Sequence, residues 1–453
     1  MANITITRIT RTNGNVNNYN IIEGFGIAAA HTVLADAIFS DTEAVPAAAT
    51  EGRHPAAFRY DRNGIPLIVT GSRGAYFAGQ YRLKGTGPGN FQIISQPFAL
   101  APGPGPGAGE FTADGFTSVL DPLGPFRLAG NWQWAMVRAT DGSNFANGPA
   151  TRLEIYFLFG PHTIPTFAGI DFPLSLLRLA FPEYATHAGL NAAALQARVI
   201  TDITTRMWDT GMDPVAPLRY DCRERHGGQS VHALALDFNL ETITTRPNGR
   251  TTCNCCDLAC WVKLTIDCLG EGPGTGAPYV AGVTVMYEEP WGCVPAGPLF
   301  GWENDPASAN CNNPFWQDVN GVARFQPNVA PNDPTRTILS THCFTVFTDT
   351  AGQQRVVDIC HGLYHHGVGP VILPHGDMDL ATYRTTCTDP PKRVVNSRRR
   401  GDGLASLLSE VRQHRVPQVN NDAVAVADEF LVVAADLMLP DPWSIMYAAN
   451  AHP

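Results

Sequence analysis

Residues 254–270 read Asn-Cys-Cys-Asp-Leu-Ala-Cys-Trp-Val-Lys-Leu-Thr-Ile-Asp-Cys-Leu-Gly, and this stretch decides the predicted fold. Asn254 is a residue type that caps a helix N-terminus, and Gly270 is the type that ends a helix. Between them, apolar residues recur every three or four positions, as on a helix with one buried face. These residues are Leu258, Ala259, Val262, Ile266 and Leu269. The stretch therefore predicts an amphipathic helix that begins at Cys255.

Cys255 falls on the first residue of this predicted helix. The backbone N–H groups there lack partners within the helix, and the helix dipole adds partial positive charge. Both effects favour the thiolate, which is the nucleophilic form of cysteine. Asp257 lies three residues after Asn254, from where its carboxylate can reach back to the first turn. Taken alone, the same helix also fits a buried element whose cysteines are small apolar residues.

The chain has 453 residues, of which 44% are hydrophobic and 16% charged, as expected for a folded protein of several domains. Its net charge of −10 argues against nucleic acid as a general partner. The sequence shows no secretory signal and no apolar run long enough to span a membrane. We therefore expect a cytoplasmic protein, or one exported by a route that the sequence does not show. Eleven cysteines without a signal favour free thiols over a disulfide framework.

Short β-branched and aromatic runs, separated by Gly, Pro and Asn, dominate the first half of the chain and predict β-rich domains. A helix is predicted within residues 190–208, because apolar residues recur there every four positions. A helix followed by strands predicts an α+β fold for the second half. The predicted parts are a β-rich N-terminal domain (1–100), a Gly/Pro linker (101–109), a second β-rich unit (110–185), an α+β core (186–389), and a basic linker with a short helical C-terminal extension (390–453).

Residues 341–358 predict a β-hairpin, because two β-prone runs flank the polar turn Asp-Thr-Ala-Gly. Folding the strands back about Thr350 brings His342 opposite Asp358, within one residue of register. Neighbours on antiparallel strands at that spacing can share a hydrogen bond. An Asp that orients a His, and a His that takes the proton of a Cys at a helix N-terminus, form a nucleophile, base and orienter set. Cys255, His342 and Asp358 are therefore the candidate catalytic residues.

The chain resembles the transglutaminase-like branch of the papain-like cysteine superfamily, over roughly residues 190–370. The nucleophile motif of that family reads Cys-x-Asp-x-Ala, and an amphipathic helix follows it and ends in Leu-Gly. The family then has a His that opens a strand and an Asp on the next strand. The matching positions are Cys255, Asp257, Ala259, Leu269, Gly270, His342 and Asp358.

Three positions depart from the family pattern. Asn254 stands where Gly or Gln is usual, and Phe344 stands where Trp is common. Gln353 follows Gly352 where the family usually has Trp. These departures leave the core chemistry in place and bear on the class of substrate.

The resemblance implies a transglutaminase-like (papain-like) catalytic core preceded by β-rich domains. It implies that Cys255 attacks a carboxamide or peptide carbonyl to form a thioester, that His342 activates the thiol, and that Asp358 holds the imidazole. The expected activity is acyl transfer or amide hydrolysis, of the protein-glutamine transglutaminase, deamidase or protease type. The expected substrate is a protein or peptide. No cofactor is expected, because neither calcium nor zinc has a clear motif, and the oligomeric state is not predicted.

Two alternatives stay open. The first is a structural zinc site, because cysteines and histidines cluster around the start of the helix. Its candidate ligands are Cys222, His226, Cys253, Cys255, Cys256, Cys260, His361, His365 and His366. Their spacing differs from the paired Cys-x-x-Cys knuckles of most zinc sites. The second alternative is a non-catalytic transglutaminase-like module that serves assembly or binding.

Overall fold

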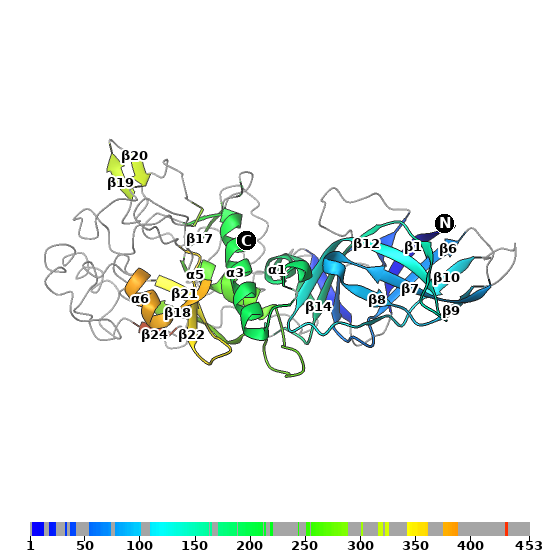
Figure 1. The fold of residues 1–453 in the computed structure, drawn as a ribbon. Helices are drawn as coiled ribbons and strands as arrows, with labels where there is room; N and C mark the ends of the chain where they lie inside the picture. The colour runs from blue at the N-terminus through cyan, green and yellow to red at the C-terminus, as the bar shows by residue number, and fades with distance from the viewer. Residues whose placement is uncertain are drawn as a thin grey trace. The chain divides into compact units, whose positions relative to one another are not determined.

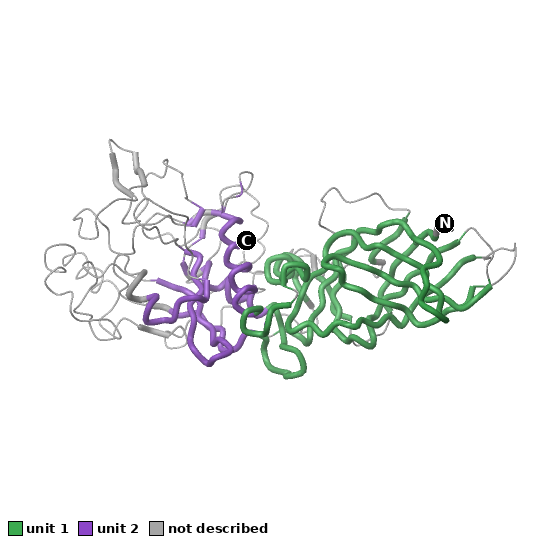
Figure 2. Tube along the Cα trace, viewed as in Figure 1, with its two compact units in different colours: residues 1–163, 167–195, 268–279 green, residues 164–166, 196–267, 280–453 purple. Residues whose placement is uncertain are grey.

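In the computed structural model, the chain forms two compact units (Figure 2). Unit 1 comprises residues 1–163, 167–195 and 268–279, and unit 2 comprises residues 164–166, 196–267 and 280–453. None of the described helices is long and apolar enough to cross a membrane. The structure describes residues 2–12, 18–23, 32–33, 37–41, 54–73, 78–100, 109–162, 164, 171–187, 189–211, 213, 218–220, 243, 251–253, 255–288, 300–301, 316–319, 322–325, 342–360, 375–387 and 431–433.

Unit 1 is built on a sheet that has fifteen strands within the described residues (Figure 1). They are β1 (Ala2–Arg11), β2 (Asn18–Glu23), β3 (Thr32–Val33), β4 (Ala37–Ser40), β5 (Ala56–Arg59), β6 (Leu67–Arg73), β7 (Gly79–Thr86), β8 (Gln92–Ile94), β9 (Phe98–Leu100), β10 (Glu110–Ala113), β11 (Thr117–Ser118), β12 (Phe126–Arg138), β13 (Asn144–Asn147), β14 (Thr151–Leu158) and β15 (Asp171–Pro173). The main path runs β10-β6-β1-β13-β12-β14-β5-β2-β15. Strand β12 also pairs with β7, which joins β8 and β9 to the sheet.

Aromatic side chains fill the core of unit 1, because alternate residues of its strands point to the same side. Trp132 and Trp134 on β12 stack with their ring centroids 6.0 Å apart. Phe91 and Phe157 stack at 5.7 Å, and both are fully buried. Each such side chain contributes roughly 1.5–3 kcal/mol by leaving water, so this cluster is a main source of stability.

One ion cluster lies within unit 1. Glu154 on β14 is fully buried and accepts hydrogen bonds from Arg127, Arg178 and Tyr156. Arg178 comes from helix α1 (Leu174–Ala180), which precedes the short helix α2 (Tyr184–His187). A buried carboxylate is tolerated only when such partners satisfy its charge. The cluster therefore ties α1 to strands β12 and β14.

The Gly/Pro segment does not separate two β domains. Strand β6 pairs with β10, and β7 pairs with β12, so strands from before and after residues 101–109 share one sheet. Gly109 accepts a hydrogen bond from the N–H of Arg73 at 2.9 Å, while residues 101–108 lie outside the described part. Residues 1–100 and 110–185 therefore form one unit, rather than the two predicted. Strand periodicity shows where strands lie but not which of them pair, so a loop within one sheet resembles a linker.

Unit 2 contains most of helix α3 (Ala192–Gly211) and, within its described residues, a five-stranded antiparallel sheet. Helix α3 confirms the predicted helix, and its stripe of Leu195, Val199, Ile203 and Met207 is buried. The sheet has the order β23-β22-β21-β18-β24 and consists of β18 (Ala281–Glu288), β21 (His342–Thr348), β22 (Gln354–Val357), β23 (His375–Asp379) and β24 (Leu431–Val433). Further elements are β16 (Leu218–Tyr220), β17 (Thr251–Cys253), β19 (Trp316–Val319), β20 (Val322–Phe325) and α6 (Leu380–Cys387).

Strand β24 belongs to the predicted C-terminal extension and pairs with β18, so this extension adds a strand to the sheet of unit 2. The basic linker after Pro390 and the short helix expected near residues 404–415 lie outside the described residues.

Helix α5 (Cys255–Asp267) is the helix predicted from the opening stretch, and it begins at Cys255 as expected. It packs against β21 and β18. Thr345 on β21 donates a hydrogen bond to the carbonyl of Ala259 at 2.8 Å, which fixes the helix on the sheet. Beyond the helix, Gly270 has a φ of 70°, the left-handed conformation expected after a helix C-terminus. Asn254, the predicted cap, lies outside the described residues.

The described cysteines include both free thiols and a disulfide-bonded residue. Cys343 is disulfide-bonded, so the expectation of free thiols does not hold at this position. Free thiols are found at Cys253, Cys255, Cys260, Cys268 and Cys360, and all five are buried.

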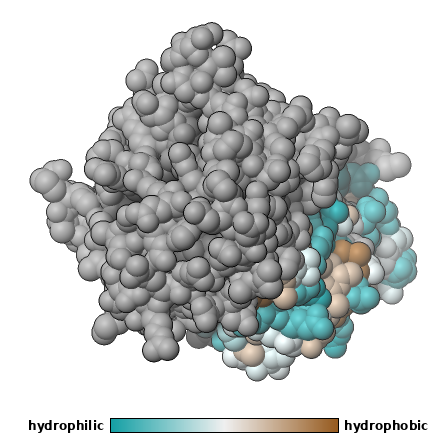
Figure 3. Space-filling model, turned by 90° about the vertical axis from the view of Figure 1, so that its left-hand side faces the viewer, coloured by the Kyte–Doolittle hydropathy of each residue, from teal (hydrophilic) through white to brown (hydrophobic). Residues whose placement is uncertain are grey.

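The described surface mixes polar and apolar residues. Figure 3 shows hydrophilic and hydrophobic residues interspersed over the described part of one face. Among the described residues, the large apolar side chains that are exposed are Val119 and Leu123, both in unit 1. Single exposed apolar residues are normal on protein surfaces, so they do not mark an interface.

Candidate active site

Three segments of unit 2 that lie far apart in the sequence bring the predicted catalytic residues together. Cys255 is the first residue of α5, which follows shortly after strand β17. His342 is the first residue of β21, and Asp358 directly follows β22. The thiol of Cys255 and the imidazole of His342 are hydrogen-bonded. The helix start and the sheet thus supply one connected group of side chains.

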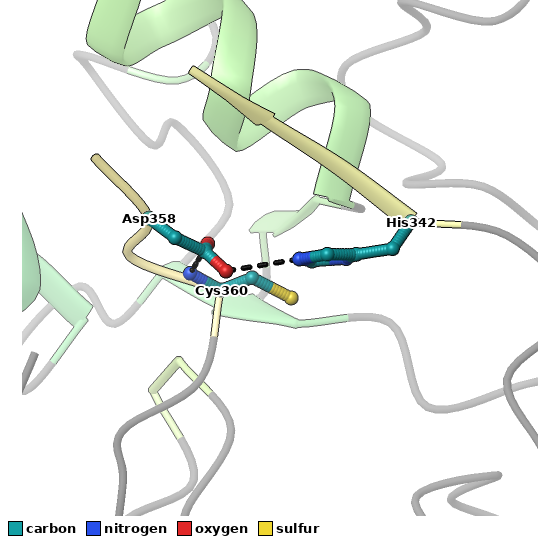
Figure 4. A group of neighbouring side chains, drawn as sticks. All are labelled: His342, Asp358 and Cys360. Carbon is teal, nitrogen blue, oxygen red and sulfur yellow. Dashed lines mark hydrogen bonds and ion pairs between the residues drawn. The ribbon is translucent and has the colours of Figure 1, made fainter. Parts of the chain in front are cut away.

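Asp358 holds the imidazole of His342. Its Oδ2 lies 2.9 Å from Nε2 of His342, and its Oδ1 accepts a hydrogen bond from the main-chain N–H of Cys360 at 2.7 Å (Figure 4). His342 is 1% exposed and Asp358 2%, so water does not compete for these bonds. Both carboxylate oxygens have fixed partners, and the imidazole is held in one orientation.

A tyrosine from α6 completes this arrangement. Tyr383 is fully buried and donates its hydroxyl proton to Oδ2 of Asp358 at 2.5 Å. The same hydroxyl oxygen lies 3.1 Å from Nε2 of His342. Because a hydroxyl oxygen can accept while its proton is donated elsewhere, Tyr383 satisfies both partners. Its ring packs against Phe344 with the centroids 4.8 Å apart, which fixes the position of the hydroxyl.

Hydrogen-bond donors surround the sulfur of Cys255. Burial raises the pKa of the Cys255 thiol, but the hydrogen bond and positive charge of His342 outweigh burial and lower it overall. The main-chain N–H of Cys343 and the hydroxyl of Tyr220, on β16, also donate to the sulfur and lower the pKa further. The first turn of α5 adds the positive end of the helix dipole. These effects together favour the thiolate.

The pKa of His342 shifts in the opposite direction to that of Cys255. Burial lowers the pKa of His342, but the charge and hydrogen bond of Asp358 raise it well above its usual value. Hydrogen bonds to Cys255 and Cys360 add to this rise. Cys255 and His342 share one proton. Because the pKa of the thiol is lowered and that of the imidazole is raised, this proton resides on the imidazole. The arrangement therefore favours a thiolate–imidazolium pair, the reactive state of a nucleophilic cysteine.

The predicted hairpin forms, but its register differs from the expected one. Strands β21 and β22 pair with Thr345 opposite Val357. One further residue along each strand, Phe344 rather than His342 comes level with Asp358. His342 and Asp358 are therefore diagonal neighbours on one face of the hairpin, a separation that side chains can bridge.

The turn explains this shift of register. The carboxylate of Asp349 accepts hydrogen bonds from the N–H groups of Ala351 and Gln353, and the N–H of Asp349 bonds the carbonyl of Gln353. The turn is thus centred on Ala351, one residue beyond the predicted Thr350. Side-chain capping of this kind is a property of Asp in turns that strand patterns do not reveal.

Cys360 brings a second thiol to the imidazole. Its Sγ, a ring nitrogen of His342 and a carboxylate oxygen of Asp358 all lie within 4.8 Å of one another (Figure 4). Among the described residues, these three side chains form the group that is close enough to hold a metal ion. Burial raises the pKa of the Cys360 thiol to about 12, although the neighbouring His342 opposes the rise. Without a metal, Cys360 is therefore a neutral thiol.

Of the zinc ligands predicted around the helix start, Cys253, Cys255 and Cys260 have described side chains. Cys253, Cys255 and Cys260 carry free thiols and belong to no metal-binding group among the described residues. The remaining predicted ligands lie outside the described side chains; they are Cys222, His226, Cys256, His361, His365 and His366.

Three residues of the site were missed by the sequence analysis. Tyr220 and Tyr383 carry no motif, and they reach the site only through the placement of β16 and α6. Cys360 had a usable signal, because it lies two residues after Asp358 and so on the same face of an extended strand.

No protein-family model matches the chain, and no curated protein matches it. The described fold is a strand-rich α+β arrangement of several sheets and a few helices. The function is therefore inferred from the chemistry of the site itself.

Proposed function

We propose that the chain is a transglutaminase-like cysteine enzyme that transfers an acyl group, or hydrolyses an amide, through a thioester on Cys255. One observation carries this proposal: hydrogen bonds run from the thiol of Cys255 through the imidazole of His342 to the buried carboxylate of Asp358. Acyl transfer needs a nucleophile, a base and an orienting group in this order. The placement of the three residues at a helix start, a strand start and the end of the next strand supports the family resemblance.

The proposed reaction has two halves. In the first, the thiolate of Cys255 attacks the carbonyl carbon of an amide, and the C–N bond breaks as the imidazolium of His342 gives its proton to the leaving nitrogen. In the second, an amine or a water molecule gives a proton to His342 and attacks the thioester, which releases the thiolate. Asp358 stays ionised throughout and stabilises the imidazolium.

Negative charge on the carbonyl oxygen needs donors during both halves. The hydroxyl of Tyr220 and the main-chain N–H of Cys343 already point at the sulfur of Cys255. The attacked carbonyl is bonded to that sulfur, so the same donors are suited to its oxygen. We assign the hydroxyl of Tyr220 and the main-chain N–H of Cys343 to this role.

The nucleophile is tested first by its reactivity. The native protein is treated with a limiting amount of iodoacetamide over about pH 5 to 9, and the labelled cysteine is located by mass spectrometry. We expect Cys255 to react first, at a pH well below that at which ordinary thiols react, and to lose this advantage in His342→Ala. Cys260→Ser is the matched control, because Cys260 is a buried free thiol one turn inside the same helix.

The reaction is tested with glutamine-containing peptides, with and without a biotinylated primary amine. Incorporation of the amine reports transfer, and release of ammonia without incorporation reports hydrolysis. We expect one of these activities in the wild type and none in Cys255→Ser. A wild-type protein that forms no thioester on Cys255 with any peptide would overturn the proposal.

A non-catalytic assembly or binding module is the competing function. It predicts that Cys255 reacts no faster than Cys260 at any pH and that His342→Ala leaves its reactivity unchanged. The opposed pKa directions of Cys255 and His342 favour the enzyme, because a purely structural thiol has no need of a base.

A further inference from the structure

Cys360 places beside the imidazole a thiol that the proposed reaction does not use. Acyl transfer needs one sulfur, which Cys255 supplies, and Cys360 assists Asp358 only through its main-chain N–H. Its side chain is nevertheless 2% exposed and directed toward the ring of His342 (Figure 4). A thiol, an imidazole and a carboxylate are the three ligand types that proteins use most for zinc.

The spacing of these donor atoms suits a single metal ion. All three lie within 4.8 Å of one another, and Nε2 of His342 and Oδ2 of Asp358 are 2.9 Å apart. Zinc bonds of about 2.0–2.3 Å place tetrahedral ligands about 3.3–3.8 Å apart. Small side-chain movements would therefore bring the three donors to zinc-binding distances.

Asp358 is also held from outside the donor group. The hydroxyl of Tyr383 donates to its Oδ2, and the main-chain N–H of Cys360 donates to its Oδ1. Outer hydrogen bonds of this kind orient the carboxylate ligands of zinc sites and raise their affinity. The carboxylate would thus keep its orientation when a metal replaces the proton that it shares with His342.

We propose that His342, Asp358 and Cys360 bind Zn²⁺ and that the bound metal switches off Cys255. Binding rests on the three donor groups alone, whereas the loss of activity rests on the proposed function. An imidazole with a metal on one nitrogen carries its proton on the other, so His342 can no longer take a proton from Cys255. The thiolate ligand selects zinc over magnesium and calcium, which prefer oxygen.

Cys255 is not one of the three donors, although it touches the same imidazole. The fourth metal position is therefore left to a water molecule. The proposal accordingly separates the two cysteines: Cys360 is required for metal binding, and Cys255 is required for acyl transfer.

Cobalt is the probe for binding, because a thiolate bound to Co²⁺ gives an absorption band in the near ultraviolet. The full chain is freed of metal with a chelator and titrated with Co²⁺, and Zn²⁺ is then added to displace it. We expect the band in the wild type, in Cys255→Ser and in the control Cys260→Ser, and its loss in Cys360→Ser. A band that persists in Cys360→Ser, or that disappears in Cys255→Ser, would assign the sulfur ligand elsewhere and overturn the site.

A measurement on the wild type alone covers the case in which Cys360→Ser does not fold. X-ray absorption at the zinc edge counts the sulfur atoms around the bound metal. One sulfur supports the site when the remaining ligands are nitrogen and oxygen. A spectrum with no sulfur, or with two or more, contradicts it.

Inhibition is measured as the ratio of the acyl-transfer rate with zinc to the rate after chelation. We expect zinc to abolish transfer by the wild type, and the zinc concentration needed to rise by about 100-fold or more in Cys360→Ser. If zinc inhibits the wild type and Cys360→Ser at the same concentration, the regulatory role is overturned. If cobalt binds as expected but no transfer is found after chelation, the proposed function fails while the metal site stands.

Discussion

At the scale of single residues, the imidazole of His342 governs the chemistry of the site. Burial alone would keep this ring neutral, and the charge of Asp358 reverses that preference. The resulting positive charge in turn lowers the pKa of Cys255, which burial alone would raise. The reactive ion pair therefore depends on a carboxylate that acts on the thiol through His342.

We expect Asp358→Asn to move the onset of Cys255 labelling to higher pH. Without the carboxylate charge, burial dominates at His342 and lowers its pKa, so the imidazolium no longer stabilises the Cys255 thiolate. The alkylation rate near pH 6 should fall by about tenfold or more, and it should recover as an ordinary thiol ionises. Initial labelling rates as a function of pH measure this shift.

Asp377→Asn is the control for this charge change. The side chain of Asp377 is 70% exposed, and it pairs with His375 rather than with a residue of the site. Its variant should keep the wild-type pH profile. If both variants slow labelling equally, a general loss of negative charge is responsible, and the specific role of Asp358 is contradicted.

We expect Tyr383→Phe to move the same onset in the opposite direction. Loss of the hydroxyl donor leaves more negative charge on Oδ2 of Asp358, which raises the pKa of His342 and so lowers that of Cys255. The onset should fall by less than about one pH unit. The free energy of unfolding should fall by roughly 1.5–3 kcal/mol, because a buried hydrogen bond to a charged group is lost. A lower stability with an unchanged pH profile would show that Tyr383 is only structural.

The candidate site was predictable where a residue carries a local signal. Cys255 follows Asn254, a residue type that caps helices, and His342 and Asp358 stand on either side of a turn within one short stretch. Tyr220 and Tyr383 carry no such signal, because they are brought to the site by elements that are distant in the sequence. A single sequence encodes such packing only through the whole fold.

At the scale of elements, the turn that follows helix α5 requires a glycine. Gly270 has a φ of 70°, and a Cβ at this position would lie 2.8 Å from the carbonyl oxygen of Gly160 and 2.9 Å from that of Pro161. Side chains adopt this φ only at a cost, and main-chain oxygens cannot move aside as a flexible side chain can. Only glycine therefore fits here.

We expect Gly270→Ala to lower the free energy of unfolding by roughly 3 kcal/mol or more, as backbone strain and overpacking add. Gly142→Ala is the matched control in the same unit, because Gly142 has a φ of 69° but nothing within 4 Å of the added Cβ. Strain alone should cost this control about 1–2 kcal/mol. Urea unfolding of both variants gives the difference, and equal losses would contradict the steric argument.

Elements were predicted better than their pairing. Helices α3 and α5 and the hairpin of β21 and β22 follow from apolar periodicity and turn residues. The hairpin register was wrong because Asp349 binds the turn in a way that periodicity does not encode. The joining of residues 1–100 and 110–185 into one sheet was missed for a related reason, since long-range pairing leaves no local pattern.

At the scale of the whole molecule, the two units have separate sheets. The described core of aromatic residues belongs to unit 1, and the candidate site belongs to unit 2. A change confined to the core of unit 1 should therefore alter stability without altering the reactivity of Cys255. Glu154 offers such a change, because its partners Arg127, Arg178 and Tyr156 all lie in unit 1.

We expect Glu154→Gln to destabilise unit 1 by roughly 3–5 kcal/mol, because it removes the buried counter-charge of Arg178 and of Arg127, which keeps only the half-exposed Glu183 as an ion-pair partner. Burial raises the pKa of Glu154, but the hydrogen bond of Arg178 and the charge of Arg127 outweigh it and lower the pKa overall. Stability from a lowered carboxyl pKa is fully present above the unfolded value of about 4.3 and is lost as the pH falls through the folded value. The difference in unfolding temperature between variant and wild type should therefore be full at neutral pH and shrink below about pH 4. Calorimetry at several pH values measures this difference. Iodoacetamide should label Cys255 in the folded variant at the wild-type rate. A slower reaction at Cys255 would show that the site depends on the packing of unit 1.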